Sequence, residues 1–339
     1  LVKHRAGSHA YGTALPTSDL DYRGIFCCDP INLLTPFFPI KQSDDETEED
    51  TKYHELSHFM KLCLDCNPNI IETLWVDNTD VLFRTPAYDL LRENRYHLLS
   101  SKVAFTFSGY VIAQLKRIKG HNKWISNPQI TQPPRQTRFV SLVQWYGVEK
   151  TYPSTFNLEN FRSNYRLVPY GGNIFGIYHQ IGYETFTVDF TLNTTFEEER
   201  HVLGIPLAIV KFNQTEYKLA HEKWEQYWTW KKNRNETRSV LEEQHGYDTK
   251  HGMHLVRLLR MGVEILRDGV VIVRRPDSDE LINIRNGSWS YEEIVRYAEE
   301  MDKEVREIWY KKTKLPRRPD IKFAADLLMK VQKLVWDGK

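Results

Sequence analysis

The sequence predicts an α/β (α+β) protein in three parts: a mixed α/β region over residues 1–130, a β-rich insert over 139–212 and a mostly helical region over 213–339. In the first part, short extended segments alternate with apolar runs at helical spacing. The second part is dominated by alternating polar and apolar residues and by glycine and proline turns. In the third part, apolar residues recur mainly at helical spacing, so we expect helices there.

Individual elements of the first region follow from these patterns. We expect strands at the extreme N-terminus, over Asp19–Cys27 and over Thr51–Glu55, and helices over Leu56–Cys66, from Pro68 and over Val103–Ile118. Proline suits a first helical turn because the N–H that it lacks would have no partner there. Residues 129–138 are rich in proline, glutamine and arginine, which indicates an exposed linker.

The third region is expected to be helical except at one place. Helices are predicted over Glu216–Arg234, Lys250–Leu266, Tyr291–Lys311 and Ala324–Val335. Between the second and third of these helices, two short apolar runs flank a group of polar turn residues. This pattern predicts a β-hairpin made of Val270–Arg274 and Leu281–Ile284.

The composition is that of a folded protein with balanced charge. Lys and Arg (46) nearly equal Asp and Glu (45), so the overall charge predicts no acidic polymer as a partner, and any nucleic-acid surface must be local. No apolar run approaches the roughly 20 residues that cross a bilayer, and the first residues lack the layout of a signal peptide. We therefore expect no membrane partner and a cytoplasmic location.

The four cysteines do not indicate a disulfide framework in a chain of this length. Cys63 and Cys66 have the spacing of half a zinc site, which would need two further ligands. They also continue an apolar helical pattern, in which cysteine behaves as a small buried residue. We predict burial for this pair.

A glycine and a serine near the start of the chain suggest phosphate binding. Gly7 follows an apolar and basic strand and lets the backbone turn sharply. Ser8 then offers a hydroxyl and an amide that can hold phosphate oxygens at the start of a helix. Alone, this pair of residues is a weak signal.

Two aspartates nearby suggest a metal site. Asp19 and Asp21 are separated by one residue, so on an extended strand their carboxylates leave the same face. Carboxylates that converge repel each other unless a cation neutralises them, and oxygen ligands suit Mg²⁺ or Mn²⁺. The alternative is an acidic turn after Pro16, because such residues favour turns.

Gly-Ser followed after a short gap by Asp-x-Asp resembles the signature of nucleotidyltransferases built on the palm of DNA polymerase beta. Further motifs resemble the predicted nucleotidyltransferases associated with RNA repair, which occur in bacteria and large phages. These motifs are Gly7–Thr13, Ser18–Gly24, Asn67–Glu72, Arg234–Asn235 and Tyr247–Leu259. The resemblance covers most of the chain outside the β-rich insert.

The resemblance implies a polymerase-beta-like palm with a mixed sheet, and a Mg²⁺- or Mn²⁺-dependent reaction with a nucleoside triphosphate. A hydroxyl attacks the α-phosphorus, pyrophosphate leaves, and two metal ions held by carboxylates stabilise both oxygens. The expected acceptor is an RNA end resembling that of tRNA, in the cytoplasm of a bacterium or a phage-infected host. A third carboxylate on a neighbouring strand completes such sites. Glu55 matches that place best, and Asp50 is the second choice.

Candidate phosphate contacts also lie in the third region. Lys250, His254 and Arg257 share one face of the predicted helix and could grip a triphosphate or an RNA backbone, or form an ordinary solvated basic face. Arg234 and Asn235 end a stretch of tryptophans and lysines and are further candidates. The aromatic residues of that stretch recur at helical spacing, which favours packing over stacking on bases.

Two other functions remain open at this stage. Related folds also modify proteins and small molecules, so the acceptor hydroxyl could belong to either. The chain could also be an RNA-binding or scaffold protein whose palm does not turn over. A Mg²⁺-dependent product that requires Asp19 and Asp21 would separate the enzyme from the scaffold.

Overall fold

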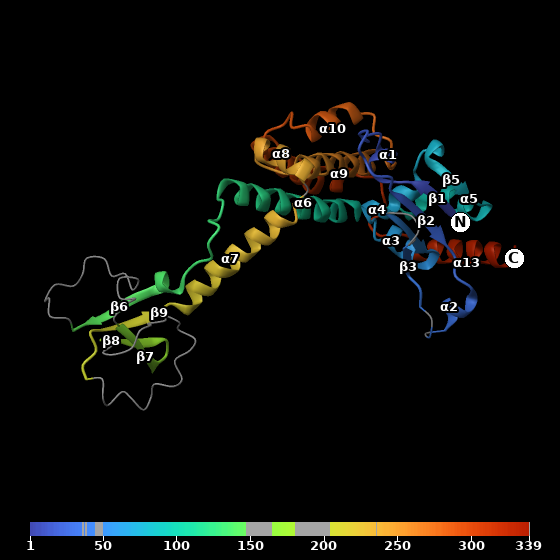
Figure 1. Cartoon of the computed structure of the whole chain (residues 1–339). Helices are drawn as coiled ribbons and strands as arrows, with labels where there is room; N and C mark the ends of the chain where they lie inside the picture. The colour runs from blue at the N-terminus through green and yellow to red at the C-terminus, as the bar shows by residue number, and fades with distance from the viewer. Residues whose placement is uncertain are drawn as a thin grey trace. The chain divides into compact units, whose positions relative to one another are not determined.

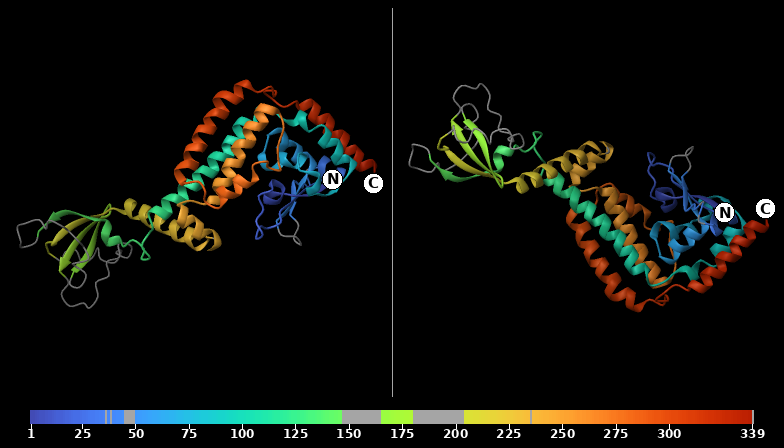
Figure 2. Two further views of the ribbon diagram at one scale, coloured as in Figure 1. Left: turned by 90° about the horizontal axis from the view of Figure 1, so that it is seen from above. Right: turned by 90° about the horizontal axis from the view of Figure 1, so that it is seen from below.

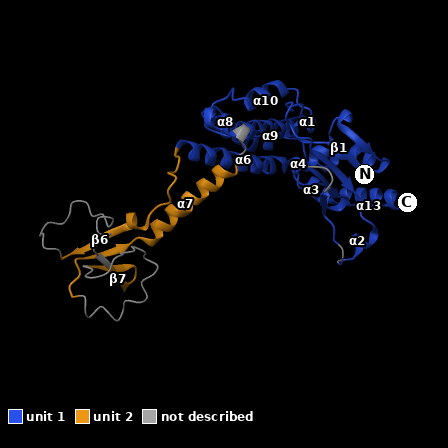
Figure 3. Cartoon of the chain, in the orientation of Figure 1, with its two compact units in different colours: residues 1–126, 236–339 blue, residues 127–235 orange. Residues whose placement is uncertain are grey.

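The computed structural model describes residues 1–35, 37, 39–44, 50–146, 165–179, 204–234 and 236–338. The chain divides into two compact units, which Figure 3 shows in different colours. Unit 1 consists of residues 1–126 and 236–339, and unit 2 of residues 127–235. Unit 2 therefore includes the predicted insert and the chain on both sides of it. Within the described residues, no helix has both the length and the apolar character that crossing a membrane requires.

Unit 1 is built on a five-stranded sheet with the strand order β3-β4-β2-β1-β5 (Figure 1). The strands are β1 (Val2–Arg5), β2 (Tyr22–Phe26), β3 (Gln42–Asp44), β4 (Thr51–Glu55) and β5 (Val81–Arg84). β2 pairs with β4 in parallel, and the other neighbours pair antiparallel. The sheet is thus mixed, and the predicted α+β class with a helical C-terminal part is confirmed. β3 and β5 were not predicted.

Helices from both ends of the chain cover one face of this sheet. Val2 and Ile25, which are partners in the β1–β2 register, are buried in one apolar cluster with residues of α3 (Leu56–Leu64), α5 (Pro86–Glu93) and α13 (Ile321–Asp337). α13 contacts both α3 and α5. The last helix of the chain is therefore part of the core beneath the first strand.

A second layer consists of long helices. α6 (Val103–Ser126), α9 (Thr249–Asp268) and α11 (Tyr291–Glu304) lie side by side in unit 1 (Figure 2). Their inward residues form a second apolar cluster. α11 continues through a π-helical turn into α12 (Tyr310–Lys312). The shorter helices of unit 1 are α1 (Gly7–Tyr11), α2 (Pro30–Leu34), α4 (Pro68–Ile71), α8 (Glu236–His245) and α10 (Ser278–Arg285).

The predicted hairpin over residues 270–284 is wrong. Residues 270–274 form no strand, and Ser278–Arg285 forms α10. Leu281 and Ile284, three residues apart, are both fully buried in the cluster that contains α9. Residues three apart lie on one face of a helix but on opposite faces of a strand, so the packing of both side chains in this cluster selects a helix.

Unit 2 contains the predicted β-rich insert. Its described strands β6 (Val140–Trp145), β7 (Tyr165–Gly171), β8 (Ile174–His179) and β9 (Ala208–Phe212) form an antiparallel sheet in the order β6-β9-β8-β7. α7 (Gln214–Lys232) follows. Tyr227 is buried, and the indole N–H groups of Trp224 and Trp228 donate to the carbonyl of Ile130, at 2.9 and 3.1 Å. These aromatic residues hold the predicted linker to α7.

The packing of α6 on α9 yields a test of the fold. A Cβ added to Gly262 in α9 would lie 3.4 Å from Phe107 of α6, whereas one added to Gly109 of α6 meets nothing within 4 Å. We predict that Gly262→Leu lowers the free energy of unfolding by about 1–3 kcal/mol through overpacking. Gly109→Leu should leave it unchanged or raise it by roughly 0.5–1 kcal/mol, because leucine favours helix more than glycine does. Equal effects in urea denaturation would contradict this packing.

Candidate functional site

The site is organised by the close approach of Asp21 to Gly7. The pairing of β1 with β2 continues past Arg5 and Tyr22, since the amide of Ala6 donates to the carbonyl of Asp21 at 2.8 Å. Gly7 has a φ of 57°, and a Cβ built on it would lie 2.0 Å from a carboxylate oxygen of Asp21. Only glycine fits here. Asp21 and Ser8, the residue after Gly7, are therefore brought to the same corner of unit 1, as the sequence predicts.

Several charges surround the Asp21 carboxyl group. Burial raises its pKa, and the nearby carboxylates of Asp50 and Asp19 raise it further, while Arg23 and Lys250 act in the opposite direction. Asp19, Asp50 and Lys250 of α9 are thus near enough to Asp21 to act on its charge. Among the described residues, the three aspartates are not a group whose ligand atoms all lie within 4.8 Å of one another, so binding of one divalent cation by all three would require side-chain rotation.

Asp19 and Asp21 do not lie on the predicted strand. β2 begins at Tyr22, and residues 19–21 precede it in irregular structure. The side chain of Leu20 is 46% exposed and Asp19 is exposed, while Asp21 is half-buried. Strand geometry therefore does not turn the two carboxylates to one face, and the predicted strand over Asp19–Cys27 is too long by three residues at its start. It is the backbone bond to Ala6 that fixes Asp21 in place.

Glu55 lies away from these aspartates. In the parallel register Tyr22 pairs with Thr51 and Phe26 with Glu55, so Glu55 is four residues farther along the sheet, about 13 Å at the usual rise per residue. Its side chain caps α3 by accepting from the amides of Ser57 and His58, at 2.7 and 3.2 Å. The structure therefore does not bring Glu55 to the place that the sequence analysis assigned to it. Asp50, the second choice, precedes Thr51 and lies beside Asp21.

A pocket of about 380 Å³ opens beside Gly7. Its walls are mixed: Arg23 and Lys52 contribute positive charge, His54 and His58 contribute imidazoles, and the remaining residues are mainly apolar or neutral polar. Sequence reasoning overlooked the basic residues of β4 and α3. Lys52 and His54 are two residues apart on the predicted strand, so their side chains are expected on the same face of it. This spacing was the signal that could have identified them.

Comparison with known proteins gives one family match. Residues 1–126 match RlaP, the RNA repair pathway DNA polymerase beta family. The match confirms the predicted resemblance over these residues, which include all of the site described so far except Lys250, while the motifs at 234–235 and 247–259 lie outside it. No curated protein and no solved structure matches the chain.

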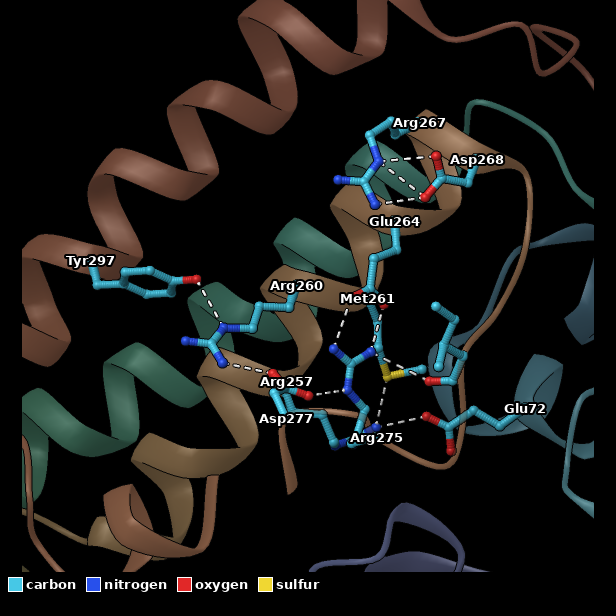
Figure 4. Close-up of polar contacts among 11 residues, drawn as sticks. Glu72, Arg257, Arg260, Met261, Glu264, Arg267, Asp268, Arg275, Asp277 and Tyr297 are labelled. Atoms are coloured by element: carbon cyan, nitrogen blue, oxygen red, sulfur yellow. Dashed lines mark hydrogen bonds and ion pairs between the residues drawn. The ribbon is translucent and has the colours of Figure 1, made fainter. Parts of the chain in front are cut away.

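The RlaP match ends with α6, but a residue of α9 is anchored inside the matching part. The guanidinium of Arg257 donates to Glu72 at 2.8 Å and lies 3.7 Å from the ring centre of Tyr11, whose hydroxyl donates to the same carboxylate at 2.6 Å. All three side chains are buried (Figure 4 shows Arg257 and Glu72). The charge of Arg257 is thus paired inside the protein, so the structure gives it a positioning role.

The other predicted contacts differ in their surroundings. His254 faces the same helix side, and burial together with Arg257 and Lys250 lowers its pKa well below the ordinary value, which keeps it neutral. Arg234 belongs to unit 2, where it lies over the ring of Trp230. Asn235 lies outside the described residues.

Cys63 and Cys66 are buried free thiols, as predicted.

Breaking the buried ion pair should destabilise unit 1. We predict that Arg257→Met lowers the free energy of unfolding by about 3–5 kcal/mol, because Glu72 is left buried without its cation. Glu72→Gln combined with Arg257→Met should recover part of this loss, since no uncompensated charge remains. Urea denaturation of the single and double variants measures both values. A single variant as stable as the wild type would contradict the pairing.

His4 predicts a specific dependence of stability on pH. Burial lowers its pKa from 6.5 to about 4, and its ring contacts Thr73 at 3.2 Å. Between pH 6.5 and 4 the unfolded chain therefore binds a proton at His4 that the folded chain does not bind. The contribution of neutral His4 to folding stability is complete above pH 6.5 and is lost as the pH falls towards 4. Between pH 7 and 5 the wild type should lose about 2 kcal/mol more stability than His4→Gln. Parallel pH profiles of the two proteins would contradict this assignment.

Proposed function

We propose that the protein is a nucleotidyltransferase that moves a nucleoside monophosphate from a nucleoside triphosphate to a hydroxyl group of an RNA end and releases pyrophosphate. The observation that carries the proposal is the close approach of Asp21 to Gly7, which places this carboxylate near Asp19 and Asp50 and beside the pocket that Arg23 and Lys52 line. The match of residues 1–126 to a polymerase beta family of RNA repair supports the same reaction class.

The residues around Asp21 fit a divalent cation in their chemistry. Asp19, Asp21 and Asp50 offer only oxygen ligands, the kind that Mg²⁺ and Mn²⁺ prefer. Burial raises the pKa of Asp21, and the nearby Asp50 and Asp19 raise it further. We assign the third position to Asp50 in place of Glu55, whose carboxylate caps α3. When bound, the ion would neutralise charge on the triphosphate and lower the pKa of the attacking hydroxyl.

The chain's own groups perform the remaining tasks. Ser8 supplies its hydroxyl and amide for phosphate oxygens beside Asp21, and Lys250 supplies a positive charge from α9. Asp50 accepts the proton of the acceptor hydroxyl. The pocket beside Gly7, with Arg23 and Lys52 in its wall, receives the anionic substrate. Contacts of His254, Arg234 and Asn235 with the substrate stay predictions.

The reaction is tested by incubating the full chain with each nucleoside triphosphate labelled at the α-phosphate, Mg²⁺ and separate pools of RNA and protein. Our proposal requires label on RNA and release of unlabelled pyrophosphate. Label on protein alone would replace RNA by a protein acceptor, and no labelled product in any pool would refute the enzymatic activity.

Substitutions distinguish the third carboxylate. We predict that Asp19→Asn, Asp21→Asn and Asp50→Asn each reduce kcat/KM by about a thousandfold, since each removes several kcal/mol of charge stabilisation. Glu55→Gln is the matched control. It should retain activity within about tenfold and lower stability by roughly 0.5–2 kcal/mol through the weakened cap. An inactive but folded Glu55→Gln together with an active Asp50→Asn would reverse the assignment.

A further inference from the structure

A second group of ligand-type side chains lies in unit 1, away from the site around Asp21. His121 of α6, Glu242 of α8 and Asp248, the N-cap of α9, bring one ligand atom each within 4.8 Å of one another. Glu242 and Asp248 are 5% and 4% exposed, and His121 is half-buried. Within the described part of the chain, no other three side chains of this kind converge as closely.

A positive charge shared by two buried carboxylates at this separation would stabilise both. Removing a carboxylate from water is costly, and a second carboxylate nearby adds repulsion unless a proton or a cation is shared. His251 adds another nitrogen at the edge of the group, with its Nε2 3.6 Å from Asp248 and its ring centre 6.2 Å from that of His121. Imidazoles and carboxylates together are a ligand set for a transition metal.

We propose that His121, Glu242 and Asp248 bind a divalent transition-metal ion of the Zn²⁺ class, with His251 or water as a further ligand. Mixed nitrogen and oxygen ligands favour Zn²⁺ over Mg²⁺ or Ca²⁺, which prefer oxygen alone. Ligand atoms of a tetrahedral zinc site lie about 3.3 Å apart, so the present spacing closes by small side-chain rotations. Asp248 keeps its second oxygen on the amide of His251, at 3.0 Å, which fixes its orientation.

The position of this group indicates a structural task. His121 lies shortly before the end of α6, where the chain leaves unit 1, and Glu242 lies in α8, where the chain returns. The side-chain amide of Asn122 already donates to the carbonyl of Gly246 at 3.0 Å. A metal at this point would link the end of α6 to α8, the two places in unit 1 that flank residues 127–235, and would fix the start of α9. Lys250, the charge near Asp21, follows Asp248 by two residues.

The test measures metal content and thermal stability. The full chain is equilibrated with Zn²⁺ in the presence of excess Mg²⁺, dialysed and analysed by mass spectrometry for zinc. We expect one zinc per chain in the wild type and in Asp21→Asn, and at least a tenfold lower occupancy in Glu242→Gln and His121→Ala. The matched control Glu243→Gln, whose exposed carboxylate is adjacent in sequence, should keep the metal.

Thermal unfolding supplies a second readout. Zinc at a hundredfold excess over its dissociation constant should raise the Tm of the wild type by about 5 °C or more and leave that of Glu242→Gln unchanged. Equal zinc content in wild type and both ligand variants would overturn the proposal. A metal-free wild type that Glu242→Gln makes more stable would also overturn it, because a shared proton would then balance the two carboxylates. Zinc lost only in Asp21→Asn would place the ion at the other site.

Discussion

The architecture of the candidate site depends on the contact between the Asp21 carboxylate and the backbone of Gly7. The antiparallel pairing of β1 with β2 places Ala6 opposite Asp21. The two ends of the connecting segment, residues 7–20, therefore lie close together. Because Gly7 turns with a positive φ, Ser8 and the start of α1 lie beside the carboxylate. The parallel pairing of β2 with β4 then brings Asp50, which precedes β4, to the start of β2, where the amide of Tyr22 donates to its carbonyl at 3.3 Å. The backbone thus places these acidic side chains in one region of unit 1 despite their mutual repulsion.

The second constraint joins the N-terminal sheet to the C-terminal helices. Arg257 of α9 binds Glu72, which lies 185 residues earlier, and stacks on Tyr11 of α1. In the C-terminal part, Arg275 is held by Glu264 and Asp277 (Figure 4), and its amide donates to the carbonyl of Tyr11 at 3.0 Å. Buried pairs of this kind are costly to break and fix one arrangement of the helices they join. The same face of α9 carries Lys250 to Asp21, so the packing of the helix and the charge of the site are linked.

The sequence predicted the local elements better than the contacts between distant residues. Thr51–Glu55 was located as a strand to the residue, because the apolar run that follows it has an unmistakable helical period. The position of Glu55 at the end of that strand suggests a metal ligand. The same position is also the N-cap of the next helix, and the Glu55 side chain caps α3. Asp50 has a positive φ and precedes its strand, so no periodicity identifies it.

The ion pair of Arg257 with Glu72 could not be predicted from residue type alone. The spacing of Arg257 from Lys250 and His254 placed all three on one helical face, but whether a basic residue there meets substrate or a buried glutamate depends on what packs against the helix. The hairpin expected over residues 270–284 failed for a similar reason, since the burial of Leu281 and Ile284 against α9 selects a helix. The proximity of Gly7 and Asp21 could be predicted because both residues belong to one short segment of the chain.

The central claim is that the acidic residues around Asp21 hold a divalent cation against a triphosphate. Crystals grown with Mn²⁺ and a nucleoside triphosphate analogue that cannot be cleaved at the α-phosphate would test it by anomalous scattering. The account predicts a manganese peak in contact with the carboxylates of Asp19 and Asp21, with the analogue's phosphates between Ser8 and Lys250. A bound analogue whose manganese peak lies away from both aspartates would contradict it.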